Sequence, residues 1–238
     1  MPKRIFFFTD IDDTLIQTKR KTNFSKNTVV GAYNKQGEAH SFFYEGTKVL
    51  IDSILDTGIN VIPTTARNLD SYKRTIFYEN TKIQYAILNF GGLILINNEV
   101  DSAWKASIEE KYNELCSMKL LYENLSSLLK EAKLEVDVKI IDNYYISIYN
   151  RYHLNVEKVI VKIREVLHLF LHENSQYYLY ENDNSFGILP KFLNKKFAVE
   201  YLINIHSPIL TIGAGDNISD LDFMQLTNFK LLPEKFIL

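Results

Sequence analysis

The sequence predicts an α/β fold in which a parallel-sheet core carries an inserted α+β domain. Short continuous apolar runs, each followed by a small or acidic residue, alternate with helix-like stretches at both ends of the chain. Such runs are typical of strands that are buried on both faces of a parallel sheet. The middle of the chain has another order, αββαββ, which is typical of a separate compact unit.

The core is predicted from four apolar runs and the helix-like stretches between them. The strands are expected at Ile5–Phe8, Ile59–Pro63, Tyr85–Leu88 and Ile209–Ile212. The helices are expected at Thr47–Asp56, Leu69–Tyr78, Lys195–Asn204 and Ser219–Leu226. A hairpin of Thr28–Tyr33 and Ala39–Phe43 around Gln36-Gly37 interrupts the core, and this flap could reach over a site at the strand ends.

The inserted domain is predicted from two helical stretches and two strand pairs. The helices are expected at Trp104–Lys133, as one long or broken helix, and at Asn155–His172. The strands are expected at Val136–Ile141, Tyr145–Tyr149, Tyr177–Glu181 and Phe186–Leu189. We therefore expect residues 1–90 and 188–238 to form the core and residues 91–187 to form the inserted domain.

Composition limits the possible partners and the location. The 238 residues are 46% hydrophobic and carry a formal net charge of −2, so no basic surplus indicates a nucleic-acid or membrane partner. No apolar run reaches the roughly 18 residues of a membrane helix, and a cytoplasmic location is expected. Cys116 is the single cysteine, which excludes an intramolecular disulfide, and its apolar neighbours predict a partly buried helical position. The sequence predicts no oligomeric state.

Paired carboxylates directly follow the first predicted strand, in FFFTDIDDTL. Asp10 and Asp12 are separated by one residue, so their side chains project to the same side of an extended chain. One carboxylate can attack a phosphorus atom, while the other, two positions on, protonates the departing alkoxide and later deprotonates a water. A phosphate monoester is dianionic, so a Mg²⁺ ion with oxygen ligands is needed to offset the repulsion. Asp13 is expected to stabilise the turn.

Other candidates follow later strands. In GAGDNISDL, Asp216 lies in a predicted strand-to-helix turn, where it can bind the metal, and Asp220 falls one helical turn further on. Thr65 in VIPTTAR can offer its hydroxyl and amide to a phosphoryl oxygen. A lysine near residue 195 can add positive charge, and among Lys191, Lys195 and Lys196 we prefer Lys195.

The motifs DxDDT, TTAR, NKKFAV and GDxxxD occur in this order and resemble those of the haloacid dehalogenase superfamily of phosphohydrolases. NFGGLIL is similar to that superfamily's crossover into a cap domain, and the αββαββ insert resembles the cap of its sucrose-phosphatase-like, phosphomannomutase-like and Cof-type branches. The resemblance covers nearly the whole chain. It implies a Rossmann-like core, with Asp10 as nucleophile and Asp12 as acid/base. Ala66 and Lys196 stand where glycine is common in the second and third motifs.

The resemblance also implies a distribution of site residues. The expected catalytic residues are Asp10, Asp12, Thr65 and Lys195. The expected metal ligands are Asp10, Asp12 through its backbone carbonyl, Asp216 and Asp220, with Asp220 alternatively in the second shell around the metal. The expected substrate-binding residues are Thr65, Arg67, Lys195 and Asn217. Arg67 could equally pair with a core acid.

The sequence therefore predicts a Mg²⁺-dependent phosphatase, a phosphoric monoester hydrolase, that acts on a small phosphorylated metabolite through an aspartyl phosphate. A sugar phosphate is the favoured class of substrate. The alternatives are a phosphomutase on the same scaffold and a non-catalytic protein that binds a phosphorylated ligand. His168 and His172 are one helical turn apart, but they are expected on a solvated helix face and not at a metal. The many tyrosines of the insert are expected in its core or on its sheet surface.

Overall fold

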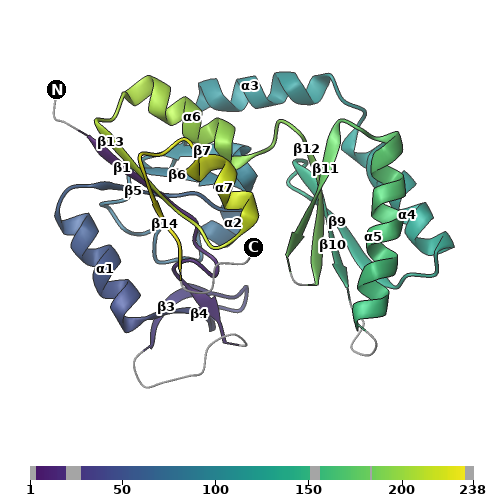
Figure 1. The fold of residues 1–238 in the computed structure, drawn as a ribbon, viewed down its shortest axis with the longest axis horizontal. Coiled ribbons are helices and arrows are strands. Elements are labelled where there is room, and N and C mark those ends of the chain that lie inside the picture. Colours follow the sequence, from purple (N-terminus) through teal and green to yellow (C-terminus); the bar gives the residue numbers. More distant parts are fainter. Residues whose placement is uncertain (1–3, 20–27, 151–155, 183, 234–238) are drawn as a thin grey trace. The chain divides into compact units, whose positions relative to one another are not determined.

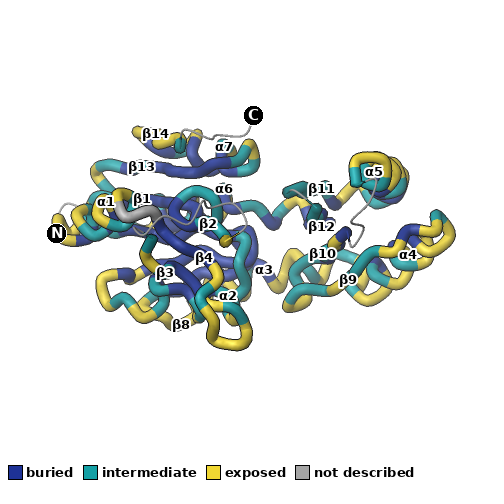
Figure 2. Tube along the Cα trace, turned by 90° about the horizontal axis from the view of Figure 1, so that it is seen from below, coloured by how far each residue is buried: buried dark blue, intermediate teal, exposed yellow. Residues whose placement is uncertain are grey.

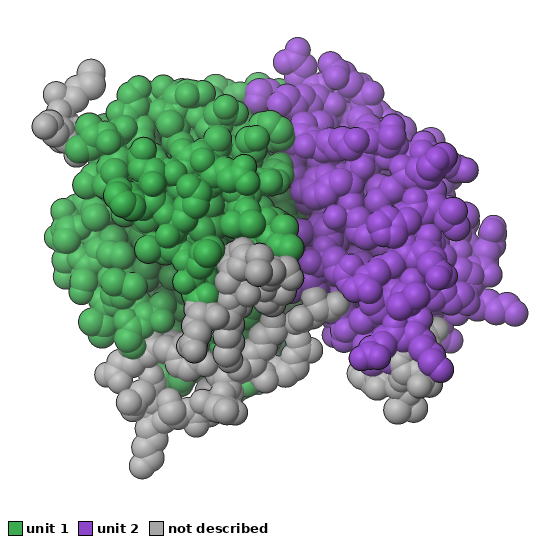
Figure 3. Space-filling model, viewed as in Figure 1, with its two compact units in different colours: residues 1–106, 194–238 green, residues 107–193 purple. Residues whose placement is uncertain are grey.

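The computed structural model describes residues 4–19, 28–150, 156–182 and 184–233 (Figure 1). The chain forms two compact units, Met1–Ala106 with Asn194–Leu238 and Ser107–Leu193 (Figure 3). These units and the domains predicted from the sequence differ in residues 91–106 and 188–193. The predicted boundaries remain a prediction about functional domains.

A parallel sheet forms the centre of the first unit, as the apolar runs predict. Its strand order is β14 (Phe229–Leu231), β13 (Leu210–Ala214), β1 (Ile5–Thr9) and β5 (Asn60–Pro63). Thr9 at the end of β1 is in register with Ala214 on one side and with Pro63 on the other. The carboxyl ends of three strands therefore lie side by side, which is where the sequence places its candidate residues.

Helices cover both faces of this sheet. Successive side chains of β1 point to opposite faces, so neighbouring phenylalanines pack against different helices. Phe7 belongs to the same buried cluster as Ile51 of α1 (Glu45–Asp56). The Phe6 ring packs edge-on against the ring of His206, the last residue of α6 (Lys195–His206). Figure 2 shows β1 and β13 as buried throughout most of their length. The fold is thus the predicted α/β arrangement with a Rossmann-like core.

The third predicted strand, β6 (Tyr85–Leu88), is present, but it makes only an isolated parallel bridge, from Ile87 to Thr64, with the chain that leaves β5. It pairs instead with β7 (Leu93–Ile96), which pairs with β8 (Glu99–Val100), in a small antiparallel sheet. The 3₁₀ turn η1 (Asn89–Gly91) reverses the chain between β6 and β7. A turn this short can join antiparallel strands only.

Helix α2 (Leu69–Tyr72) is much shorter than the predicted helix Leu69–Tyr78, so that prediction was wrong. The backbone beyond it pairs with β3 (Thr28–Tyr33) instead of continuing a helix. The Tyr33 amide donates to the Arg74 carbonyl at 2.9 Å, and the Ile76 amide donates to the Gly31 carbonyl at 3.0 Å. Long-range pairing therefore overrides the local helical pattern.

The predicted flap is present as an antiparallel sheet of β2 (Gln17–Thr18), β4 (Ala39–Tyr44) and β3. The Asn34 side chain closes its turn by accepting from the amides of Gln36 and Glu38, both at 2.9 Å. Whether the flap reaches over the site stays a prediction.

The second unit contains the predicted αββαββ order. Helices α4 (Met118–Glu131) and α5 (Val156–Glu173) lie on one side of an antiparallel sheet (Figure 1). Its strands are, in spatial order, β11 (Tyr177–Asn182), β12 (Ser185–Pro190), β10 (Tyr145–Asn150) and β9 (Val136–Ile141). The core between these layers includes Leu125, Leu167 and Ile188, all fully buried. This unit is the inserted α+β cap domain of the predicted fold.

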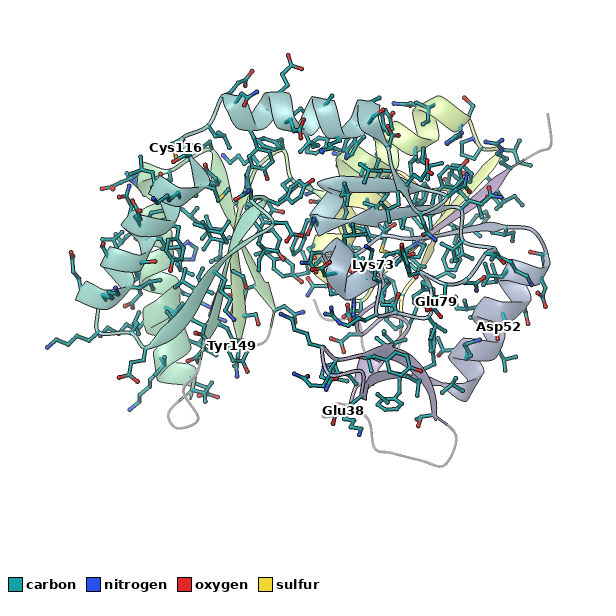
Figure 4. All side chains as sticks on the ribbon, turned by 180° about the vertical axis from the view of Figure 1, so that it is seen from behind. Glu38, Asp52, Lys73, Glu79, Cys116 and Tyr149 are labelled. Carbon is teal, nitrogen blue, oxygen red and sulfur yellow. The ribbon has the colours of Figure 1, made fainter. Side chains whose placement is uncertain are left out.

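The predicted helix Trp104–Lys133 is broken into α3 (Ser102–Asn113) and α4, because the Ser117 side chain caps α4 by accepting from the Leu120 amide. Cys116 lies in the connection and is exposed (Figure 4), so the prediction of a partly buried helical residue was wrong. His168 and His172 are on the exposed face of α5, as predicted.

The tyrosines of the second unit range from buried Tyr177 to exposed Tyr149, labelled in Figure 4, while Tyr152 is outside the described residues. Among the helices that the structure describes, none combines the length and the apolar character that crossing a membrane requires.

Candidate active site

Asp10 begins the loop that leaves the central strand β1. Its amide donates to the Ala214 carbonyl at 2.9 Å, so it still extends the pairing with β13. The amides of Leu15 and Ile16 both donate to the Ile11 carbonyl, at 2.9 and 3.0 Å, and close a tight turn. Asp13 has a φ of 63° within this turn, a conformation that Asp tolerates better than most residues. The turn thereby fixes the acidic segment at the edge of the sheet.

Asp216 and Asp220 are placed by the start of α7 (Ile218–Met224). Asn217 caps this helix, since its side chain accepts from the Ser219 amide while Asp220 Oδ2 accepts from the Asn217 amide at 3.3 Å. Gly215 allows the strand to pass close to the helix, because a Cβ atom there would lie 2.4 Å from the Cβ atom of Asp220. The glycine before Asp216 is therefore a steric requirement of the acidic site.

Lys195 is the first residue of α6, and Asn194 caps that helix. Its Nζ atom lies 2.7 Å from Asp10 Oδ1 and 2.7 Å from Asp220 Oδ1. Lys191 is exposed and Lys196 is half-buried, whereas Lys195 is only 6% exposed. Among the three candidate lysines, the structure brings Lys195 to the aspartates.

Gly91 packs closely against Asn194, the residue that caps α6. It has a φ of 94°, and a Cβ atom there would lie 2.6 Å from the Asn194 carbonyl oxygen. The turn after β6 thus packs directly against the residue that caps α6, and a larger side chain at position 91 would push the two apart.

Three buried carboxylates converge around Lys195. Asp10, Asp216 and Asp220 each offer an oxygen, and these oxygens lie within 4.8 Å of one another. The Thr14 hydroxyl is 2.9 Å from Asp216 Oδ1 and 3.3 Å from Asp10 Oδ2. Hard oxygen donors at this spacing fit Mg²⁺, which prefers one or two carboxylates with further oxygen ligands. Sequence reasoning missed Thr14, although its place four residues after Asp10 in the same motif was available as a signal.

The crowding of like charges changes the acidity of the site. Burial raises the pKa of Asp10 well above its usual range, and nearby Lys195 opposes that rise. Burial raises the pKa of Asp216 to about 6, against the lowering effect of the Thr14 hydrogen bond. Burial would lower the pKa of Lys195, but the charges of Asp10 and Asp220 outweigh it and raise that pKa. One lysine is insufficient for three buried carboxylates, so the site favours a further cation.

Asp12 is placed differently from the other acidic residues. Its Oδ1 atom accepts from Arg67 Nη2 at 2.6 Å and its Oδ2 atom accepts from Arg67 Nε at 2.7 Å. Burial acts to lower the pKa of Arg67, but the charge of Asp12 raises it. The sequence left open whether Arg67 contacts substrate or pairs with an acid, and in the structure it pairs with Asp12.

Thr65 lies between the ends of β5 and β6. Its amide donates to the Ile87 carbonyl at 2.8 Å, and its hydroxyl accepts from the Arg67 amide at 3.1 Å. Asn89 and Phe90, both with positive φ, return hydrogen bonds from their amides to the carbonyls of Arg67 and Thr65. Sequence reasoning also missed this role of Asn89, which fastens the turn after β6 to the loop that carries Thr65.

The fold and the site fit a phosphatase of the haloacid dehalogenase type, a phosphoric monoester hydrolase, and the match to a family model shows that the chain is of this class. The family model described as sucrose-6F-phosphate phosphohydrolase matches residues 3–230, and the chain belongs to this family of sugar-phosphate phosphatases. A comparison with curated proteins gave no match.

Several solved structures share the fold of this chain. A sucrose-phosphatase from Synechocystis, in complex with sucrose and phosphate, has a TM-score of 0.63 at 12% identity, over 99% of this chain and 84% of that one. The C-terminal domain of a C. albicans trehalose-6-phosphate phosphatase has a TM-score of 0.63 at 14% identity, over 94% and 73%. A haloacid dehalogenase-like hydrolase from Bacteroides thetaiotaomicron has a TM-score of 0.55 at 11% identity, over 97% and 94%.

Proposed function

We propose that this protein hydrolyses the phosphate monoester of a small sugar in a Mg²⁺-dependent reaction with an aspartyl-phosphate intermediate. The observation that carries the proposal is the meeting of Asp10, at the end of the central strand, with Lys195 and two further buried carboxylates. A carboxylate beside a buried ammonium group and a predicted cation site is the setting that nucleophilic attack on a dianion needs.

In the proposed first step, an Asp10 carboxylate oxygen forms a bond to phosphorus while the bond from phosphorus to the sugar oxygen breaks. Asp12 gives its proton to that departing oxygen, and the sugar leaves as an alcohol. In the second step, a water molecule gives a proton to Asp12 and attacks the same phosphorus. The bond from phosphorus to Asp10 breaks, inorganic phosphate leaves, and both aspartates return to their starting states.

The remaining residues are proposed to bind and orient the phosphoryl group. Thr65 offers its hydroxyl and Lys195 its positive charge. Asp10, Asp216, Asp220 and the backbone carbonyl of Asp12 would hold Mg²⁺, which when bound supplies positive charge against the phosphate. For Asn217, whose side chain caps α7, contact with substrate remains a prediction.

A sugar phosphate is the proposed class of substrate because the matched family and the similar structures are named for sucrose and trehalose phosphates. The test is phosphate release from a panel that includes sucrose-6-phosphate, trehalose-6-phosphate, hexose phosphates and glycerol phosphate, with Mg²⁺ present. We expect one or a few sugar esters to be hydrolysed much faster than glycerol phosphate, and Asp10→Asn to be inactive on all. Release from every ester at the Asp10→Asn background rate would contradict the proposal.

A further inference from the structure

Arg67 makes the most specific side-chain contact of the site that the proposed steps do not use. Its Nε and Nη2 atoms donate to the two different oxygens of Asp12, at 2.7 and 2.6 Å. This two-pronged pairing fixes the plane of a carboxylate as well as its position. We infer that Arg67 is a positioning residue, which aims the Asp12 carboxylate at the leaving oxygen, and does not itself bind substrate. The inference rests on the proposed function, because it presumes that Asp12 transfers protons.

The exposure of the two side chains supports this assignment of roles, with Arg67 as the support and Asp12 as the group that faces the substrate. The Arg67 side chain is 15% exposed, and the Asp12 side chain is 40% exposed. Arg67 is thus the more buried partner, and the side chain of Asp12 is the more open to solvent. A residue whose purpose is to bind the substrate phosphate would be expected to present its own donors to the solvent side.

Arg67 is held firmly enough to act as a support. Its amide donates to the Thr65 hydroxyl at 3.1 Å, and its carbonyl accepts from the Asn89 amide at 2.8 Å. Its third guanidinium nitrogen, Nη1, donates to the Ser71 carbonyl at 3.3 Å. The backbone and the side chain of Arg67 are both restrained in the folded protein. Little further conformational entropy is therefore lost when Arg67 holds Asp12 in place.

Buried Lys195 and half-buried Arg67 therefore have separate partners. Lys195 contacts Asp10 and Asp220, whereas Arg67 contacts Asp12. A lysine at position 67 would keep the charge but would lose the two-pronged geometry. The effect of Arg67→Lys should therefore resemble loss of proton transfer more than loss of phosphate affinity.

The experiment compares two esters that differ in their need for a proton. A phenolate leaves poorly without protonation, and a p-nitrophenolate leaves well without it. We expect Arg67→Met and Arg67→Lys to lower kcat/KM on phenyl phosphate by about 10-fold or more, and on p-nitrophenyl phosphate by about threefold or less. The parameter kcat/KM is chosen because it reports only the steps up to departure of the phenol.

A double-mutant cycle and a binding measurement complete the test. In an Asp12→Asn background, Arg67→Met should change kcat/KM on phenyl phosphate by less than about twofold, because the group that it positions is already gone. The dissociation constant of inorganic phosphate, measured by calorimetry, should stay within about threefold of the wild-type value. Lys73→Met is the matched control. Lys73, labelled in Figure 4, is exposed and lies six residues after Arg67, so its replacement removes a positive charge from the same part of the chain without touching Asp12's partner.

The alternative is that Arg67 binds the phosphoryl group. In that case kcat/KM would fall equally on both esters, phosphate would bind at least about tenfold more weakly, and the losses from Arg67→Met and Asp12→Asn would add. That result would overturn the inference while leaving the proposed function intact. If wild-type protein hydrolyses neither these two esters nor any sugar phosphate of the panel above the Asp10→Asn background, the proposed function itself fails, and this inference fails with it.

Discussion

Replacing Lys195 by methionine removes the ammonium group that separates two buried carboxylates. The Nζ atom is 2.7 Å from an oxygen of Asp10 and 2.7 Å from an oxygen of Asp220, and their side chains are 8% and 2% exposed. Removing one partner of a buried ion pair leaves an uncompensated charge and costs about 3–5 kcal/mol. With a urea dependence of about 2 kcal/mol per M, the unfolding midpoint should fall by about 2 M.

The measurement is urea unfolding in the presence of chelator, followed by tryptophan fluorescence. Trp104 is the single tryptophan of the chain, and its indole nitrogen donates to the Gly91 carbonyl at 2.9 Å, so its emission reports on the first unit. Adding Asp10→Asn to Lys195→Met should restore part of the lost stability, because one unpaired charge disappears. If Lys195→Met costs less than about 1 kcal/mol, or if Asp10→Asn makes the double variant less stable still, the account of the buried charges is wrong.

Three further outcomes follow from the same site. Hydrolysis should stop in excess chelator and return with Mg²⁺, and Mg²⁺ at 100 times its dissociation constant should raise the free energy of unfolding by about 2.7 kcal/mol; unchanged turnover in chelator would count against the metal. Asp12→Asn should slow turnover about 10²- to 10⁴-fold with little change in phosphate affinity, as measured by calorimetry, and an equal loss of affinity would argue for a binding role. Gly215→Ala should displace Asp220, destabilise the first unit by about 1–3 kcal/mol and weaken Mg²⁺ binding in a titration, whereas wild-type affinity would show that the close approach is dispensable.

The sequence was sufficient for the parts of the fold that local pattern determines. Apolar runs such as Ile5–Phe8 are long enough to mark buried strands, and the order of the motifs placed Asp10 and Lys195 in one site. The helix after Leu69 was overpredicted, because pairing of the following backbone with β3 is a long-range interaction that no local window contains. The break at Ser117, next to exposed Cys116, was predicted only as one of two possibilities, although its signal, a serine that caps α4, is local.

The contacts between side chains were harder to predict than the residues themselves. Thr14 was visible in the first motif, but its hydrogen bonds to Asp10 and Asp216 depend on the tight turn that brings it back to the sheet edge. Arg67 was assigned two equal roles, because the partner that selects one of them, Asp12, is 55 residues away in the chain. Spacing along the chain identifies candidates, and only the fold determines which of them meet.

The central claim is that Asp10 becomes phosphorylated during turnover, and rapid quenching of Asp12→Asn with p-nitrophenyl phosphate tests it most directly. This ester needs little proton donation, so the first step should still proceed, while the second step lacks its base and the intermediate accumulates. We predict a burst of about one p-nitrophenolate per active site, with the phosphoryl group located on the peptide that contains Asp10 by mass spectrometry of the acid-quenched protein. Steady release without a burst, together with an unmodified Asp10 peptide, would show that water attacks the ester directly and would contradict the account.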